Sequence, residues 1–260
     1  MPLISVITIC FNNLADVQKT CASVDMQTTQ PFEHWIINGS TTAAIANWLE
    51  STPQPHYRKW ITERDKGISD AFNKGIANAN GVIIHLLNSG DVYADATILS
   101  IVEKAFQHNN DVQWLSGKIR IKRSEQIIEV GKPFDKKQLY KGMRSVAHPT
   151  WFLRKEIYER VGVFNLNYTI AMDYDLMCRL ISEPYQFINK TMIVFDNSGV
   201  SSNNYLQSLQ QNIQVYESYF GYSLKCRLWQ MRLKILFYLL QTNLGKFLFT
   251  IKKKAGLANV

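Results

Sequence analysis

Runs of apolar residues alternate with amphipathic segments over the first half of the chain. Short apolar runs bounded by polar or turn-forming residues are typical of buried strands, and an apolar residue at every third or fourth position is typical of helices packed on them. The pattern predicts strands at residues 3–10, 34–38, 58–62, 82–88 and 112–121, and helices at 13–26, 42–50, 67–79 and 95–107. Repeated strand and helix units indicate an α/β fold, with a mainly parallel sheet flanked by helices on both faces.

The strand predicted at 82–88 ends in an unusual polar sequence. It is apolar from Val82 to Leu87 except for His85, as in strands covered on both faces. Four residues follow it: Asn88, Ser89, Gly90 and Asp91. Ligands of α/β proteins gather beyond the carboxyl ends of strands, and a carboxylate beside amide and hydroxyl oxygens suits a divalent cation that also binds phosphate. The alternative is that Asp91 caps the helix predicted from residue 95.

Charge is distributed unevenly along the 260 residues. Residues 218–260 contain eight basic residues and no acidic ones, so the formal net charge of +8 lies in this segment. Nucleic-acid binding is not expected, because the remainder is neutral and shows no basic stripe. With 46% hydrophobic residues the chain can bury a substantial core. We predict one large domain at 1–200 and a helical, basic region at 201–260.

Several motifs are missing. The four cysteines show no Cys-x-x-Cys spacing, and the first ten residues lack the basic start and cleavage site of a signal peptide. These features predict a reducing, cytoplasmic compartment. A Gly-x-Gly-x-x-Gly sequence is also missing, which counts against a nicotinamide or flavin enzyme of Rossmann type.

Two stretches resemble a known family. The first starts Asp-Lys-Gly-Ile-Ser-Asp-Ala-Phe-Asn-Lys-Gly-Ile at Asp65 and continues through an apolar strand to Leu-Asn-Ser-Gly-Asp at 87–91. The second, Ala-Met-Asp-Tyr-Asp, starts at Ala171. Together they resemble the family 2 glycosyltransferases of GT-A fold, of the bacterial cell-surface polysaccharide type. The resemblance implies a Rossmann-like, mainly parallel mixed sheet, with a nucleotide-sugar-binding half at 1–123 and an acceptor half at 124–200.

The resemblance assigns residues to the donor side of the site. It gives Asp91 the role of holding a divalent metal, Mn²⁺ or Mg²⁺, although Gly90 stands where the family usually has an acid. Phe11 lies in the segment that contacts the nucleotide in the family; the alternative is that its ring is buried. Asn38 replaces an acid that commonly reads the nucleobase. The residues expected to bind the nucleotide sugar are Cys10, Phe11, Asn12, Asn38, Ser40, Asp65, Lys66, Gly67, Asn73, Asn88, Ser89 and Gly90.

The acceptor side is expected to supply the catalytic base. By resemblance Asp173, at the start of a helix, is the general base. The alternative is that its only role is a favourable interaction with the helix dipole. The spacing of Asp175 and Arg179 predicts an ion pair on one helix face. His148 is expected to contact phosphate or acceptor, and Trp151 to offer a stacking face for a sugar. The alternatives are a structural hydrogen bond for His148 and a core position for Trp151.

The implied activity is inverting transfer of a sugar from a UDP-, GDP- or dTDP-sugar to a hydroxyl of a glycan or lipid-linked glycan, as in lipopolysaccharide or exopolysaccharide synthesis. Asp91 and Asp173 favour an active enzyme. The alternative is a degenerate relative that binds nucleotide or glycan, or helps to assemble a membrane complex. It is suggested by Asn38, Thr42 and Gly90, which replace common acids of the family.

The basic tail is rich in Leu, Phe and Ile, but polar residues interrupt it too often for a membrane span. On a helical projection Lys225 and Arg232 fall on one side, and Arg227 and Lys234 nearly opposite. A lysine cluster follows at 252–254. We predict peripheral attachment to the anionic inner face of the cell membrane. The alternative is that these helices pack on the catalytic domain or on a partner.

Overall fold

The computed structural model describes residues 3–123, 126–143, 146–196 and 204–243, together with 245, 247 and 249. The strands are β1 (Ile4–Cys10), β2 (Glu33–Asn38), β3 (Arg58–Thr62), β4 (Ile83–Leu86), β5 (Val92–Tyr93), β6 (Trp114–Arg123), β7 (Gln126–Val130), β8 (Phe152–Arg154) and β9 (Tyr185–Phe195). The α-helices are α1 (Leu14–Asp25), α2 (Ala44–Ser51), α3 (Ile68–Asn78), α4 (Ile98–His108), α5 (Lys155–Val161), α6 (Met172–Arg179), α8 (Tyr205–Phe220) and α9 (Leu224–Gln241). Two short 3-10 helices are η1 (Lys136–Lys141) and η2 (His148–Thr150).

One sheet runs through the molecule. Among the described residues it has nine strands in the order β3-β2-β1-β4-β8-β6-β9-β5, with β7 paired to β6. The strands β1 to β4 are mutually parallel, whereas β8 runs antiparallel to both β4 and β6. The predicted α/β class with a mainly parallel mixed sheet is confirmed. The two predicted halves, 1–123 and 124–200, both contribute strands to this sheet.

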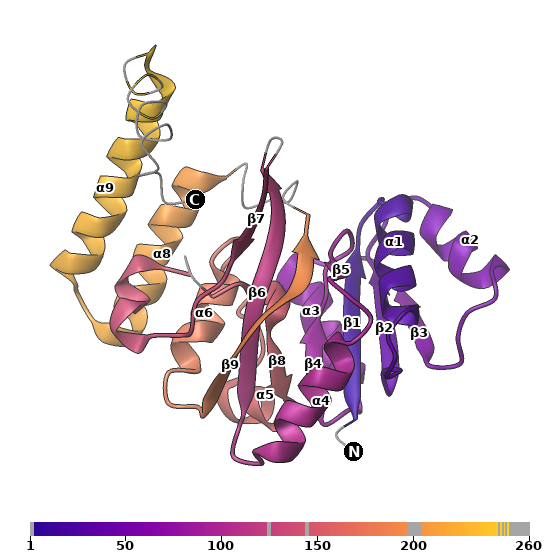
Figure 1. The fold of residues 1–260 in the computed structure, drawn as a ribbon. Coiled ribbons are helices and arrows are strands. Elements are labelled where there is room, and N and C mark those ends of the chain that lie inside the picture. Colours follow the sequence, from indigo (N-terminus) through magenta and orange to yellow (C-terminus); the bar gives the residue numbers. More distant parts are fainter. Residues whose placement is uncertain are drawn as a thin grey trace.

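Helices cover both faces of the sheet, because the side chains of a strand alternate between its faces. From β1, Ile7 packs with Phe72 of α3, whereas Ile4 and Val6 pack with Leu99 of α4. Figure 1 shows α3 and α4 against the central strands, and α1 and α2 near the β3 end of the sheet. The predicted helices and strands are all present, with boundaries shifted by up to three residues.

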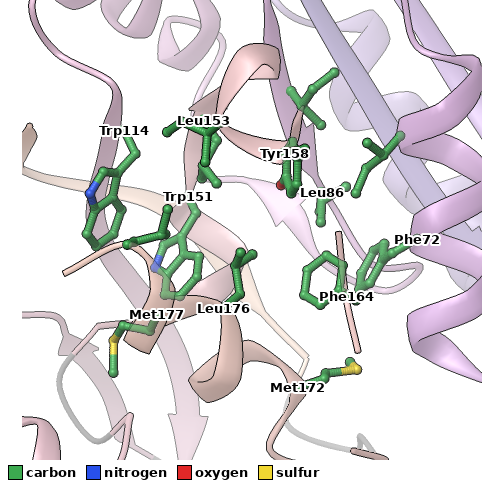
Figure 2. Packing of buried hydrophobic residues seen from close by; sticks show 14 of the residues in the cluster. Phe72, Leu86, Trp114, Trp151, Leu153, Tyr158, Phe164, Met172, Leu176 and Met177 are labelled. Carbon is green, nitrogen blue, oxygen red and sulfur yellow. The ribbon is translucent and has the colours of Figure 1, made fainter. Parts of the chain in front are cut away.

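The largest core cluster lies between the sheet and α3, α5 and α6. Trp114 and Trp151 meet edge to face, with ring centroids 5.4 Å apart, beside Met177 of α6 (Figure 2). On the other side of the same view Phe72 and Phe164 lie together above Met172. This cluster fixes the start of α6, where Asp173 lies.

The helices α8 and α9 form an antiparallel pair at the side of the sheet away from α1 and α2 (Figure 1). Gln211 of α8 accepts hydrogen bonds from the backbone N–H groups of Ile170 and Ala171, both at 3.0 Å, so α8 is attached directly to the start of α6. In the described part of the chain no helix is both long and apolar enough to cross a bilayer. The lysine cluster at 252–254 lies outside the described residues.

Candidate active site

The carboxyl ends of the parallel strands meet at one edge of the sheet. Cys10, at the end of β1, pairs in register with Asn38 of β2, which pairs with Thr62 of β3. The loops that follow β1, β2, β3 and β4 therefore emerge side by side. This edge is where ligands of α/β proteins bind, and it contains most of the residues expected to bind a nucleotide sugar.

The loop after β1 presents an open aromatic ring. The side chain of Phe11 is 59% exposed, so a buried ring, the alternative interpretation, is excluded. Asn12 next to it has a φ of 56°, a left-handed conformation that asparagine tolerates. The Asn12 backbone N–H donates to Ser40 Oγ at 2.8 Å, and Asn12 Oδ1 accepts from Thr41 N at 3.0 Å. Asn12 and Ser40 thus hold together the loops after β1 and β2, next to Phe11 in the chain.

Two residues predicted to contact the nucleotide are buried, and these predictions are wrong. Asn38 has no exposed surface, since its amide donates to Thr62 Oγ1 at 3.3 Å and accepts from the Ser40 backbone at 3.2 Å. Cys10 is 5% exposed, and burial raises the pKa of its thiol to about 12. A neutral amide suits this inward position better than an acid does, because an ionised carboxylate is costly to bury.

Asp65 lies directly against the loop after β2. A Cβ atom at Gly39 would be 1.8 Å from Asp65 Oδ2, so only glycine leaves room for this carboxylate. Asp65 Oδ1 accepts from the backbone of Gly67 at 2.9 Å, and Gly67 has a φ of 110°. Lys66 is exposed beside them. Asp65, Lys66 and Gly67 are therefore at the predicted edge, whereas Gly39 was missed because its role depends on a contact between distant segments.

Asn73 joins two segments of the fold. Its Nδ2 donates to the Phe164 carbonyl and its Oδ1 accepts from the Phe164 N–H, both at 2.9 Å. These two bonds clip α3 to the loop after α5, and the nucleotide contact expected of Asn73 stays a prediction. Nearby, Asp70 and Lys74 form an ion pair at 3.6 Å.

The turn after β4 is held by α1. Thr20 Oγ1 accepts from the Gly90 N–H at 2.9 Å and donates to the Asp91 carbonyl at 2.8 Å. Asn13 Nδ2 donates to Ser89 Oγ, and the Asn88 carbonyl accepts from the Asp91 N–H at 3.1 Å. Thr20 and Asn13 gave no local signal in the sequence, because they act through contacts with residues some 70 positions away.

The carboxyl group of Asp91 is almost fully buried, at 1% exposure. Its Oδ1 accepts from the Asp196 N–H at 2.8 Å, whereas the buried Oδ2 has no hydrogen-bond partner among the residues that the structure describes. Burial is the main cause that raises the pKa of Asp91 to about 7, and Asn88 and the Asp196 amide act against it. Asp91 does not cap a helix, since α4 begins later, at Ile98. The capping alternative is therefore wrong.

This turn offers oxygen ligands suited to a divalent cation. A buried carboxylate oxygen without a hydrogen-bond partner needs a cation or a proton, and carboxylate oxygens are the ligands that Mg²⁺ and Mn²⁺ prefer. The described residues contain no group of three or more His, Cys, Asp and Glu side chains able to hold a metal. A cation at Asp91 would therefore draw on water and phosphate for most of its ligands, as Mg²⁺ often does.

A second acidic site lies at the start of α6. Asp173 Oδ2 is 3.7 Å from His148 Nδ1, and Asp173 Oδ1 is buried with no hydrogen-bond partner in the described segments. Burial raises the pKa of Asp173, partly offset by His148, and burial lowers the pKa of His148. The Asp173 side chain is 26% exposed, so a partly open carboxylate with a raised pKa stands beside a neutral imidazole.

His148 and Trp151 are enclosed. Trp151 is 2% exposed, so the prediction that it offers a stacking face for a sugar is wrong, and its core position is confirmed. His148 is 5% exposed and surrounded by the rings of Phe72, Trp151 and Phe164. Its described contacts favour the alternative of a structural partner, here to Asp173, over direct contact with phosphate or acceptor.

The loop that carries His148 is anchored by a histidine of β4. His85 Nε2 lies 3.0 Å from the Pro149 carbonyl, and His85 Nδ1 lies 2.7 Å from the Tyr93 hydroxyl. Burial lowers the pKa of His85 to about 3, so the ring is neutral and can donate one of these bonds and accept the other. The polar break in the apolar strand is thus a buried hydrogen-bonding residue that positions His148.

Asp175 has the structural role expected of it. Its Oδ2 accepts from Arg179 at 2.7 Å, which confirms the predicted ion pair, and its Oδ1 accepts from the Tyr219 hydroxyl of α8 at 2.7 Å. Asp173 takes no part in this arrangement. The two carboxylates of one helical turn are therefore separated into one that fixes the helix and one that faces the site.

The donor side and the start of α6 are in contact. The hydroxyl of Ser69, in the first turn of α3, lies 2.8 Å from Met172 Sδ and 3.4 Å from the Tyr168 carbonyl oxygen. The loop of Asp65 leads directly into this turn. The structure thus brings the segment around Asp65 and the segment around Asp173 together, although about 100 residues separate them.

Comparison with known proteins gives a consistent picture. The model of glycosyl transferase family 2 matches residues 5–162. An uncharacterized glycosyltransferase of Mycobacterium tuberculosis is 30% identical over 206 residues, which covers 77% of this chain and 78% of the relative. A PGL/p-HBAD biosynthesis glycosyltransferase of Mycobacterium bovis is 26% identical over 186 residues, covering 70% and 71%.

Solved structures share the fold at low sequence identity. A mannosyltransferase from Pyrobaculum calidifontis, in complex with GDP-Man and Mn²⁺, aligns with a TM-score of 0.63 and 14% identity over 99% of this chain and 81% of its own. TarS of S. aureus, in complex with UDP-GlcNAc, aligns with a TM-score of 0.63 and 13% identity over 84% and 67%. These likenesses confirm the predicted GT-A fold.

Proposed function

The chain belongs to glycosyl transferase family 2 and is a nucleotide-sugar-dependent glycosyltransferase, and from this premise we propose that it is an inverting, metal-assisted enzyme with Asp173 as general base. The donor is a UDP-, GDP- or dTDP-sugar, and the acceptor is a hydroxyl of a glycan or lipid-linked glycan. The observation that carries the proposal is the contact of Ser69 with Met172, which joins the donor edge to the start of α6.

The nucleotide is proposed to bind along the edge formed by the loops after β1, β2 and β3. Phe11 offers the open ring on which a flat base can stack, and Asp65 places a carboxylate at the same edge. Lys66, exposed beside Asp65, supplies positive charge toward the diphosphate. Recognition of the base does not depend on Asn38, whose amide is buried.

Replacing Phe11 with alanine is expected to weaken nucleoside diphosphate binding. Stacking of a base on an aromatic ring contributes about 1–3 kcal/mol, so the dissociation constant should rise by about 5- to 150-fold. Isothermal titration with UDP and GDP measures the change. Phe32→Ala is the matched control, because Phe32 is also an exposed phenylalanine, at 44%, and follows α1 at the other end of that helix. Equal affinity in both variants would exclude stacking on Phe11.

Asp91 is the residue proposed to hold the divalent metal, with Asn88 and Ser89 at the same turn. When bound to the diphosphate, such a cation would neutralise the charge that develops on the leaving group. Thr20 fixes the backbone of this turn through both Gly90 and Asp91. The turn is thus held in place by α1 before any ligand arrives.

Asp173 is proposed to accept the proton of the acceptor hydroxyl. The acceptor oxygen forms a bond to the anomeric carbon as the bond from that carbon to the diphosphate oxygen breaks, and the proton passes to the carboxylate. The raised pKa of Asp173 strengthens it as a base, and its partial exposure leaves it within reach of an acceptor. Attack opposite the leaving group inverts the anomeric configuration.

The decisive experiment is a screen of UDP-, GDP- and dTDP-sugars for binding and turnover, with Mn²⁺ or Mg²⁺ present and absent, and with lipid-linked and soluble glycan acceptors. Transfer with inversion would support the proposal. Binding without turnover on any acceptor would favour the alternative of a non-catalytic nucleotide- or glycan-binding relative.

The outer face of α9 supports attachment to a membrane surface. Four exposed apolar residues share one face, because they are spaced three or four positions apart. They are Leu224, Leu228, Met231 and Ile235, each between 49% and 60% exposed. The opposite face, with Cys226 and Leu233, is buried. The alternative, in which these helices pack on the catalytic domain, therefore describes α8 and the buried face of α9.

The basic residues of α9 flank this apolar stripe. At about 100° per residue, Lys225 and Arg232 lie on one side of the stripe, and Arg227 and Lys234 on the other. An apolar stripe between two basic flanks is typical of helices that lie in the interface of an anionic bilayer. We therefore propose that the enzyme binds to the inner face of the cell membrane, where a lipid-linked acceptor would be available.

Substituting Ile235 with glutamate is expected to release the protein from anionic vesicles. The side chain is 60% exposed, so the change removes apolar surface from the stripe and adds a repelled charge without disturbing the core. Sedimentation with vesicles of phosphatidylglycerol and phosphatidylcholine measures how the protein partitions between vesicle and solution. We expect this partitioning to fall by at least about tenfold. Leu166→Glu, at a 51% exposed leucine outside α9, is the control. Equal partitioning of both variants would refute the attachment.

A further inference from the structure

The turn after β4 meets the end of β9. The short strand β5 pairs with β9 so that Val92 lies opposite Val194. This pairing brings the residue before β5 next to the residue after β9, and Asp91 Oδ1 accepts from the Asp196 N–H at 2.8 Å. Asp91 and Asp196, which are 105 positions apart in the sequence, are therefore neighbours.

Gly90 makes room for the side chain of Asp196. A Cβ atom at Gly90 would lie 2.9 Å from Asp196 Oδ2 and 3.3 Å from Asp196 Cβ. The φ of Gly90 is 101°, which disfavours any other residue. The carboxylate of Asp196 thus lies where a side chain at position 90 would begin, and position 90 is where the resemblance leads us to expect an acid.

The second carboxylate lies beside an unsatisfied one. Asp91 is 1% exposed, and within the described part of the chain its buried Oδ2 has no hydrogen-bond partner. The carboxylates of Asp91 and Asp196 repel each other, and the Lys19 ammonium offsets part of that repulsion at Asp91. A divalent cation would offset more of it, and it accepts carboxylate oxygens as ligands.

We propose that Asp196 is a second protein ligand of the divalent cation that binds with the nucleoside diphosphate, in place of the missing acid at position 90. Asp91 is then the inner ligand, which also fixes the backbone of Asp196, and Gly90 is the residue whose small size admits the Asp196 carboxylate. This inference rests on the proposed function, because the diphosphate supplies further ligands. It gives the end of β9, outside both resembling stretches, a direct part in donor binding.

The test measures metal binding without turnover. Mn²⁺ is titrated into the protein in the presence of saturating UDP or GDP, and free Mn²⁺ is followed by its electron paramagnetic resonance signal. Asp196→Asn keeps the size of the side chain and the backbone N–H that Asp91 uses, but removes the charge. We expect Mn²⁺ to bind at least about tenfold more weakly to Asp196→Asn than to the wild type.

Two further variants make the result interpretable. Asp111→Asn, at an exposed aspartate after α4, is the control and should bind Mn²⁺ like the wild type. Asp196→Ser also lacks the carboxylate, and it replaces Asp196→Asn if circular dichroism shows that the latter is unfolded. Wild-type Mn²⁺ affinity in a folded Asp196 variant would overturn the inference.

The outcomes also separate this inference from the proposed function. If wild-type protein binds a nucleoside diphosphate but Mn²⁺ binds no more tightly in its presence, the inference is overturned and metal-independent transfer remains. If none of UDP, GDP and dTDP binds, either with metal or without it, both the proposed donor and the inference are wrong.

Discussion

Replacing Asp173 with asparagine is expected to lower the rate of sugar transfer by about 10²–10⁴-fold, the usual contribution of a general base. Asparagine has nearly the same shape but cannot accept the proton of an acceptor hydroxyl at its amide. Donor binding should be unchanged, because the nucleotide is proposed to bind at the edge formed by Phe11 and Asp65. Steady-state transfer kinetics and titration with the nucleoside diphosphate separate the two effects.

The pH dependence gives a second readout of the same residue. Burial raises the pKa of Asp173, so its carboxylate becomes protonated at a higher pH than an ordinary aspartate as the solution is acidified. Transfer should fall on the acid side through this raised pKa, and the acid limb should be missing from whatever residual transfer Asp173→Asn retains. Substantial transfer by Asp173→Asn with an unchanged pH profile would remove Asp173 from the role of base.

Replacing Asp175 with alanine is expected to destabilise the protein by about 3 kcal/mol, since removing one partner of a buried ion pair leaves the other charge unpaired. The Asp175 and Arg179 side chains are only 2% and 14% exposed, and they lie 2.7 Å apart. The change also removes the acceptor of the Tyr219 hydroxyl, which joins α6 to α8. Urea unfolding followed by circular dichroism gives the free energy of unfolding.

A solvent-exposed ion pair provides the control for this variant. Lys190 pairs with Asp95, and their side chains are 36% and 42% exposed, so Lys190→Ala should cost less than about 1 kcal/mol. The comparison with Asp173→Asn is equally informative, because that variant should lose transfer and keep its stability. A free energy of unfolding for Asp175→Ala within 1 kcal/mol of the wild type would contradict the structural role of Asp175.

Local patterns predicted much of the fold and part of the site. The apolar runs identified β1 to β4 and the helices between them, because a buried strand or an amphipathic helix is determined largely by its own residues. They did not identify β5, β7, β8 and β9. β5 and β8 contain two and three residues, too few for a periodic pattern, and the polar residues Asn189 and Lys190 interrupt the apolar pattern of β9.

The predicted site residues also divide into those whose position the local sequence indicated and those whose side-chain direction it did not. Phe11, Asp65 and Asp173 lie in accessible positions at the expected places, since each follows a strand or starts a helix that the pattern could predict. Cys10, Asn38 and Trp151 are buried, because the direction of a side chain at the end of a strand depends on its neighbours. A motif alone does not distinguish a residue that points into the site from one that supports it.

The sequence by itself therefore determined the class of fold, the edge at which a ligand binds and the acids available there, because these depend on local periodicity and on residue type. Only the tertiary structure decided which groups act together. The pairing of β5 with β9 placed Asp196 beside Asp91, and the packing of α6 placed Asp173 beside His148. Burial then raised the pKa of Asp91 and Asp173, an effect that depends on the surrounding atoms and not on the order of residues.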